Sequence, residues 1–223
     1  MMSRLFLFIA FMLALAPVAA RAQDGHEYSP LVEKSVNYKD WTFKSLKDGA
    51  PVNLRSLAEG KRLMLVVYFA PWCPNWRNEA PVAARLYEKY KAQGLEVVGV
   101  GEYASVADVR AFFGEGGAPY TVVTESEARE DRDKTTHYGY RQLAGDTRRW
   151  GSPWNIFLEP SKLKKTGDVL TESAWVVNGE LIEAEVEKFI RERLGLDTKD
   201  TKPAAFLQQP QTTTTAVTPC KQQ

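Results

Sequence analysis

The sequence contains few of the residues that bind metals or form disulfide bonds. Its 223 residues include two cysteines, Cys73 and Cys220, and two histidines, His26 and His137. The two cysteines are too far apart in the sequence to form a Cys-x-x-Cys motif, and the acidic stretch 125–133 lacks the Asp/Asn and Gly spacing of a calcium loop. The sequence therefore predicts neither a metal site nor a cofactor.

An excess of basic residues is also absent. The chain has 29 Lys and Arg against 28 Asp and Glu, and loss of Arg4 and Arg21 with the leader predicted below would leave a net charge of −1. Nucleic-acid binding depends on a basic excess facing the phosphates. The composition therefore argues against a nucleic-acid partner.

Long apolar runs are missing after the N-terminus. Residues 1–22 contain Arg4, then an apolar stretch of about a dozen residues, then the small-x-small sequence Ala20-Arg21-Ala22. This order is typical of a secretory signal peptide, and the stretch is shorter than the roughly 20 apolar residues that cross a bilayer. We therefore predict cleavage after Ala22, a periplasmic or secreted location, and no membrane anchor after cleavage.

Composition divides the remaining chain into three parts. Residues 23–40 form an N-terminal extension, residues 41–196 have the apolar patterning of one domain, and residues 197–223 are rich in Thr, Gln and Pro. A segment of that last kind buries too little apolar surface to offset the entropy of ordering. We expect it to be a disordered, low-complexity tail.

Strand and helix patterns alternate in the domain. Continuous apolar runs at 63–69 and 95–100 are typical of central strands buried on both faces. Helical patterns follow them at 74–91 and 106–113. The order strand, helix, strand, helix predicts a parallel pair of strands with helical crossovers.

Further elements are expected on both sides of this unit. Apolar alternation around an Asp-Gly turn predicts a hairpin over 41–54. A short strand is expected at 120–123, and a strand at 155–158 is expected to pair with 175–177. The pattern at 181–194 predicts a closing helix with Ile182 on its apolar face. The fold class is therefore α/β.

Cys73 follows the apolar run 63–69 and precedes the first long helix. The N-terminus of a helix presents unpaired N–H groups and a positive dipole end, which favour a thiolate. Pro74 suits the first helical position, and Arg77, one turn later, would add positive charge. Sites in α/β sheets usually form at this carboxyl edge, although a lone cysteine is also a common core residue.

Two segments resemble the active site of the thioredoxin superfamily, in particular the exported TlpA/ResA-like and redoxin-like (AhpC/TSA-like) disulfide reductases. Residues 69–81, FAPWCPNWRNEAP, are similar to a Trp-Cys-Pro-x-Cys run followed by a helical Pro. Residues 151–158, GSPWNIFL, are similar to the family segment Gly-Thr-Pro-x-x-Phe-Leu. The resemblance covers about 41–194. It implies a thioredoxin fold, with a central mixed sheet flanked by helices and an N-terminal β-hairpin extension.

The resemblance also implies roles for individual residues. Cys73 would be the catalytic thiol, and Pro153 would be the cis-proline that faces it. Ser152 and Pro153 would present backbone to a bound substrate, and Trp154 would be a further substrate-binding residue. The active-site turn would comprise Pro71, Trp72, Pro74, Asn75, Trp76 and Arg77.

The sequence departs from the family pattern at Trp76, which stands where the second cysteine is expected. A dithiol enzyme attacks with one thiol and resolves the mixed disulfide with the other, and an indole cannot do so. One interpretation is a monothiol oxidoreductase that acts on protein or small-molecule thiols and disulfides, with an external thiol as reductant. Cys220 is a candidate for a remote resolving thiol, because the tail beyond Leu196 spans roughly 25–30 Å.

Two alternatives remain open at this point. The first alternative is a redox-inactive module that binds peptides in a groove of Trp72, Trp76, Pro153 and Trp154, since aromatic residues dominate binding hot spots. The second is a thiol peroxidase of the peroxiredoxin type. Ala70 argues against the peroxidase, because that family has a Thr or Ser three residues before its reactive cysteine.

Overall fold

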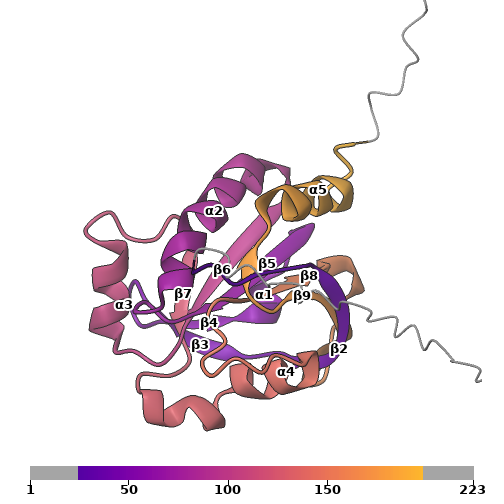
Figure 1. Ribbon diagram of the computed structural model, residues 1–223. Helices are drawn as coiled ribbons and strands as arrows, with labels where there is room; N and C mark the ends of the chain where they lie inside the picture. The colour runs from indigo at the N-terminus through magenta and orange to yellow at the C-terminus, as the bar shows by residue number, and fades with distance from the viewer. Residues whose placement is uncertain (1–24, 198–223) are drawn as a thin grey trace, which may run out of the picture.

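A computed structural model describes residues 25–197 of the chain (Figure 1). The predicted signal peptide, residues 1–22, and Cys220 in the predicted tail lie outside the described residues. None of the helices in the described part combines the length and apolar character needed to cross a bilayer.

The main sheet has eight strands and is mixed. Strand β5 lies near its centre, parallel to β6 on one side and antiparallel to β8 on the other. In spatial order the strands are β2 (Val32–Lys39), β9 (Val169–Val177), β8 (Trp154–Leu158), β5 (Leu63–Phe69), β6 (Leu95–Gly101), β7 (Thr121–Thr124), β3 (Thr42–Ser45) and β4 (Pro51–Asn53). A separate parallel pair joins β1 (Tyr28–Ser29) to β10 (Glu180–Leu181).

Helices cover both faces of the sheet (Figure 1). Figure 1 shows α2 and α5 on one side and α4 on the other. The helices are α1 (Leu54–Leu57), α2 (Pro74–Tyr90), α3 (Val106–Phe113), α4 (Thr136–Ala144) and α5 (Glu183–Arg193), and the short 3-10 turns are η1 (Lys91–Gln93), η2 (Arg129–Lys134) and η3 (Pro160–Lys162).

Strand β5 divides the core into two halves because successive strand side chains point to opposite faces. Leu65 and Val67 belong to the apolar cluster that contains the buried faces of α2 and α5. Val66 and Tyr68 belong to the cluster that contains α4 and β8. All seven residues of β5 are buried, as the continuous apolar run predicts.

The predicted central elements are confirmed. The runs at 63–69 and 95–100 form parallel neighbours β5 and β6, and residues 41–54 contain the antiparallel hairpin of β3 and β4. The predicted pairing of 155–158 with 175–177 is also present, between β8 and β9.

The closing helix begins later than predicted, at Glu183. Glu180 and Leu181 are extended because they pair with β1. Ile182 therefore lies at the N-cap and is 39% exposed, so its predicted place on the apolar face of the helix is wrong.

Two other segments add to the sheet and its cover. Residues 32–39, within the predicted N-terminal extension, form the edge strand β2 against β9. Thr135 caps α4 by accepting a hydrogen bond from the Tyr138 amide at 3.0 Å. The charged region around 125–139 therefore leads into a regular helix.

Candidate active site

Cys73 is the N-cap residue of α2, and Pro74 takes the first helical position. Its backbone is extended, with φ −77° and ψ 126°, and its amide donates to the Ala70 carbonyl at 3.0 Å. The thiol is free, and the residue is 8% exposed. The first-turn N–H groups of α2 therefore point toward the segment that carries a largely buried sulfur.

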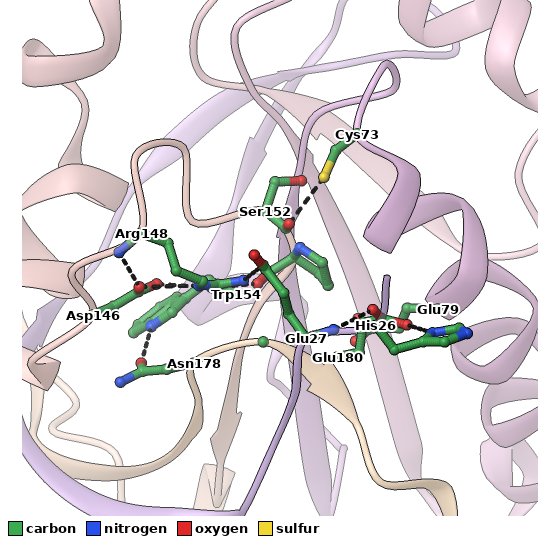
Figure 2. A network of polar contacts seen from close by, with 12 residues as sticks. His26, Glu27, Cys73, Glu79, Asp146, Arg148, Ser152, Trp154, Asn178 and Glu180 are labelled. Atoms are coloured by element: carbon green, nitrogen blue, oxygen red, sulfur yellow. Dashed lines mark hydrogen bonds and ion pairs between the residues drawn. The ribbon is translucent and has the colours of Figure 1, made fainter. Parts of the chain in front are cut away.

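The loop before β8 lies directly against this sulfur (Figure 2). The peptide bond between Ser152 and Pro153 is cis. The Ser152 carbonyl oxygen is 3.0 Å from Cys73 Sγ, and the Ser152 hydroxyl accepts a hydrogen bond from the Ala70 amide at 2.8 Å. Ser152 therefore joins the cysteine turn to the proline loop through both its backbone and its side chain.

The contact between Cys73 and Ser152 is one that a protonated thiol makes, because the S–H group donates to the carbonyl oxygen. A thiolate would lose this donor and would be favoured by the helix N-terminus instead. Nucleophilic attack by Cys73 therefore requires loss of the proton and release of the Ser152 carbonyl, which becomes free to accept another hydrogen bond.

A buried ion-pair network supports the proline loop (Figure 2). Arg148 donates to the Pro153 carbonyl at 2.8 Å and pairs with Asp146 at 2.8 Å. Asp146 also pairs with the fully buried Arg141 at 3.2 Å. Burial raises the pKa of Asp146, but the hydrogen bonds and charge of Arg148, together with the Arg141 charge, outweigh it and hold the pKa below its usual value.

Trp76 is a core residue. Its side chain has no exposed surface and stacks on Phe69, with ring centroids 4.4 Å apart, and it also contacts Phe112. The residue at the position where the resemblance implies a second cysteine therefore fills the space between α2, β5 and α3.

Trp154 is also fully buried, and its indole N–H donates to Asn178 Oδ1 at 2.8 Å. Pro153 is likewise buried. The predicted groove of Trp72, Trp76, Pro153 and Trp154 is therefore wrong for three of its four residues, because the sheet and helices cover them.

The other predicted turn residues differ in exposure. Trp72 is half-buried, and its indole N–H donates to the Tyr103 carbonyl at 3.1 Å. Arg77 is exposed, with its guanidinium carbon 6.0 Å from the centre of the Phe112 ring. Within the described residues the Arg77 side chain makes no hydrogen bond to Cys73. The structure therefore shows no direct contact through which Arg77 would stabilise a thiolate. Pro71 and Asn75 are buried and Pro74 is exposed.

A groove of about 530 Å³ lies beside the turn. Its lining comes from the cysteine turn, from α2 and from α3. The lining residues are Pro71, Trp72, Arg77, Asp108, Ala111 and Phe112. Among the described residues, no group of three or more His, Cys, Asp or Glu side chains is arranged to hold a metal ion.

Glu79 is a buried acid that the sequence analysis missed. It accepts hydrogen bonds from the Leu181 amide at 2.8 Å and from Asn155 Nδ2 at 3.2 Å. Burial raises the pKa of Glu79 to about 8, against the lowering effect of these hydrogen bonds. Its signal lies in helical spacing, since Glu79 falls in the buried stripe of α2 between Trp76 and Ala83.

Trp150 and Tyr103 were also missed. Trp150 meets Trp72 edge to face, with centroids 5.3 Å apart. Tyr103 has a φ of 60°, which is rare for a residue with a side chain, and its hydroxyl contacts His137 Nδ1 at 3.0 Å. Neither residue has a periodic pattern around it, so no sequence signal would have placed it near Cys73.

Replacement of Asp146 by Asn should destabilise the fold by about 3 kcal/mol at neutral pH, because Arg141 would lose its buried counter-charge. A carboxylate with a lowered pKa stabilises the fold above its ordinary pKa and stops doing so as pH falls through the folded value. The deficit should therefore disappear in acid. Urea unfolding against pH measures it, with Asp131→Asn, which removes the exposed pair with Lys134, as control. Equal stability of Asp146→Asn and wild type at pH 7 would contradict the role of the network.

The raised pKa of Glu79 makes stability change with pH in the opposite direction to the lowered pKa of Asp146. Unfolding releases a carboxyl that ionises near 4.5, so wild-type stability should fall between about 4.5 and 8. Glu79→Gln removes the charge and keeps an acceptor. Its stability relative to wild type should rise by about 1.4 kcal/mol per pH unit across this range. The exposed Glu172→Gln serves as control, and pH profiles that run parallel for Glu79→Gln and wild type would rule out the burial argument.

Residues 36–149 match the profile of the AhpC/TSA family. A search of curated proteins finds no match. Three solved structures are similar in fold. A thioredoxin-family thiol:disulfide interchange protein from Chlorobium tepidum TLS is 20% identical, with a TM-score of 0.51, and the match covers 76% of this chain and 98% of that one.

A thiol:disulfide interchange protein from a Bacteroides species is 18% identical, with a TM-score of 0.50 and coverage of 79% and 94%. A secreted thiol-disulfide isomerase from Corynebacterium glutamicum is 17% identical, with a TM-score of 0.50 and coverage of 70% and 84%. These likenesses agree with the predicted thioredoxin fold, a mixed sheet flanked by helices. Because the family profile matches more than half of the sequence, the chain belongs to the AhpC/TSA family.

Proposed function

We propose that this protein is an exported monothiol thiol-disulfide oxidoreductase that acts through Cys73. One observation carries the proposal. The sulfur of Cys73 lies at the N-terminus of α2 and 3.0 Å from the carbonyl of Ser152, next to the cis Pro153 bond, while Trp76 fills the position of a second thiol.

The reaction is two successive exchanges at one sulfur. The Cys73 thiolate attacks a disulfide RSSR, which forms a Cys73–S–S–R bond and releases RS⁻ to take up a proton. An external thiol R′SH then loses its proton and attacks the R sulfur, which gives RSSR′ and restores the Cys73 thiolate. The electrons balance because the external thiol, and not a second residue of the domain, becomes oxidised.

The proline loop gives the site its substrate contact in this proposal. Once the thiol proton leaves, the Ser152 carbonyl is a free acceptor beside the sulfur and suits a backbone N–H of a bound peptide. The names of the similar structures, thiol:disulfide interchange protein and secreted thiol-disulfide isomerase, support disulfide-bearing protein substrates and an exported location.

The proposed division of the chain agrees with this role. Residues 1–22 are removed as a signal peptide, residues 23–40 contribute the edge strand β2 to the sheet of the thioredoxin-like domain of 41–196, and residues 197–223 form the tail. The external thiol makes Cys220 unnecessary for turnover. The burial of Trp76 and Trp154 speaks against the redox-inactive binding module, because that alternative needs their indoles at the surface.

The test uses the Cys220→Ser protein with bis(2-hydroxyethyl) disulfide and an added thiol. We expect a mixed disulfide on Cys73 by mass spectrometry, its release by the thiol, and turnover equal to that of the protein with Cys220 intact. Cys73→Ser should lose all of these and keep the unfolding midpoint. Absence of the mixed disulfide in folded protein refutes the proposal, and rapid oxidation by hydrogen peroxide alone would indicate the peroxidase instead.

A further inference from the structure

Two half-buried indoles border the candidate nucleophile. Trp72 immediately precedes Cys73, and Trp150 lies two residues before Ser152, whose carbonyl contacts the sulfur. The two rings meet edge to face at 5.3 Å, and the Trp72 indole N–H is fixed to the Tyr103 carbonyl. The cysteine turn and the proline loop therefore share one aromatic surface beside the sulfur.

Three arginines pack on this surface. The guanidinium carbon of Arg129 lies 4.1 Å from the centre of the Trp72 ring and 5.7 Å from that of Trp150. Arg149 and Arg132 lie 5.1 and 5.8 Å from the Trp150 ring. A guanidinium held against a ring face keeps N–H groups at its edge, and these match the geometry of a carboxylate.

Arg129 and Arg149 form no ion pair with an acidic residue of the described segment 25–197. Both are exposed, and across residues 25–197 neither forms an ion pair, although Glu127 and Glu130 are close to Arg129 in sequence. Arg132 differs, because it pairs with Asp133.

Two arginines far from this surface are neutralised locally. Arg85 pairs with Glu183, and Arg191 pairs with Asp197, both at 2.7 Å. Arg129 and Arg149, like Arg77 of the neighbouring groove, are exposed and form no ion pair within residues 25–197, so their positive charge is available to a ligand.

The geometry points to a small thiol or disulfide that carries carboxylates as the ligand of Arg129 and Arg149, a substrate class that rests on the proposed function. The groove of about 530 Å³ beside Trp72 has the size of a small-molecule site. Arg77 and Asp108 both line that groove, and the anionic end of the ligand is assigned to Arg129 and Arg149, which pack on the Trp72 and Trp150 rings.

Such a ligand fits the role of the external thiol. Its sulfur attacks the mixed disulfide on Cys73, the substrate sulfur leaves with it as a new disulfide, and the Cys73 thiolate is restored. The carboxylates remain ionised throughout and are held by the two guanidinium groups. Since the domain has no second thiol at Trp76, this binding would raise the local concentration of the missing reactant.

The experiment compares 3,3′-dithiodipropionate with its uncharged bis-amide as substrates of the Cys220→Ser protein. The rate ratio of dianion to amide is the readout, because it cancels the intrinsic reactivity of Cys73. We expect the double variant Arg129→Gln, Arg149→Gln to lower this ratio about fivefold, because ion pairs at exposed sites are weak. The rate with the uncharged amide should stay unchanged. One molar salt should lower the ratio of the unsubstituted protein in the same direction.

A ring-packed control far from Cys73 is Arg193, which lies 4.9 Å from the Phe189 ring and 5.5 Å from that of Trp175, and which has a long ion pair with Glu159 at 3.8 Å. Arg193→Gln should leave the rate ratio unchanged. A ratio that is insensitive to both salt and the double substitution overturns this inference and leaves the proposed function intact. Failure of both disulfides to react with folded protein overturns the two together.

Discussion

Ser152 holds together the two segments on which the candidate chemistry depends. Its hydroxyl accepts from the Ala70 amide at 2.8 Å, and its carbonyl lies 3.0 Å from Cys73 Sγ. Both segments leave the sheet at one edge, since Tyr68 of β5 is registered with Trp154 of β8. The sulfur is therefore placed by strand register and by one serine. Arg148, which pairs with Asp146, stabilises the same loop by donating to the Pro153 carbonyl.

The same packing accounts for the place of Trp76. Trp76 occupies the helical position next to Cys73 and fills the core against Phe69, so it adds apolar contacts where a resolving cysteine would stand. In the proposed reaction, the resolving thiol therefore comes from solution. The unpaired Arg129 and Arg149 beside Trp72 and Trp150 provide a place for such a molecule to bind.

Sequence reasoning predicted the parts of the molecule that have a local signal. The bounds of β5 agree with the apolar run 63–69, and Cys73 is the N-cap that the following proline indicates. It erred on Trp76 and Trp154, because an indole next to a site motif has the same local pattern whether it packs inward or outward. The packing of Arg129 and Arg149 on Trp72 and Trp150 could not be predicted from the sequence, since the loops around 129 and 150 are brought to Cys73 by tertiary contacts alone.

The most direct test of this account compares the reaction rate of Cys73 with a neutral disulfide in native protein and in the same protein unfolded in urea, with Cys220→Ser as background. Burial alone protects a thiol, so a core cysteine would react faster once the chain unfolds. An activated cysteine at a helix N-terminus reacts faster in the native state. We predict the higher rate in native protein, and a rate that rises on unfolding would contradict the assignment of Cys73 as the nucleophile.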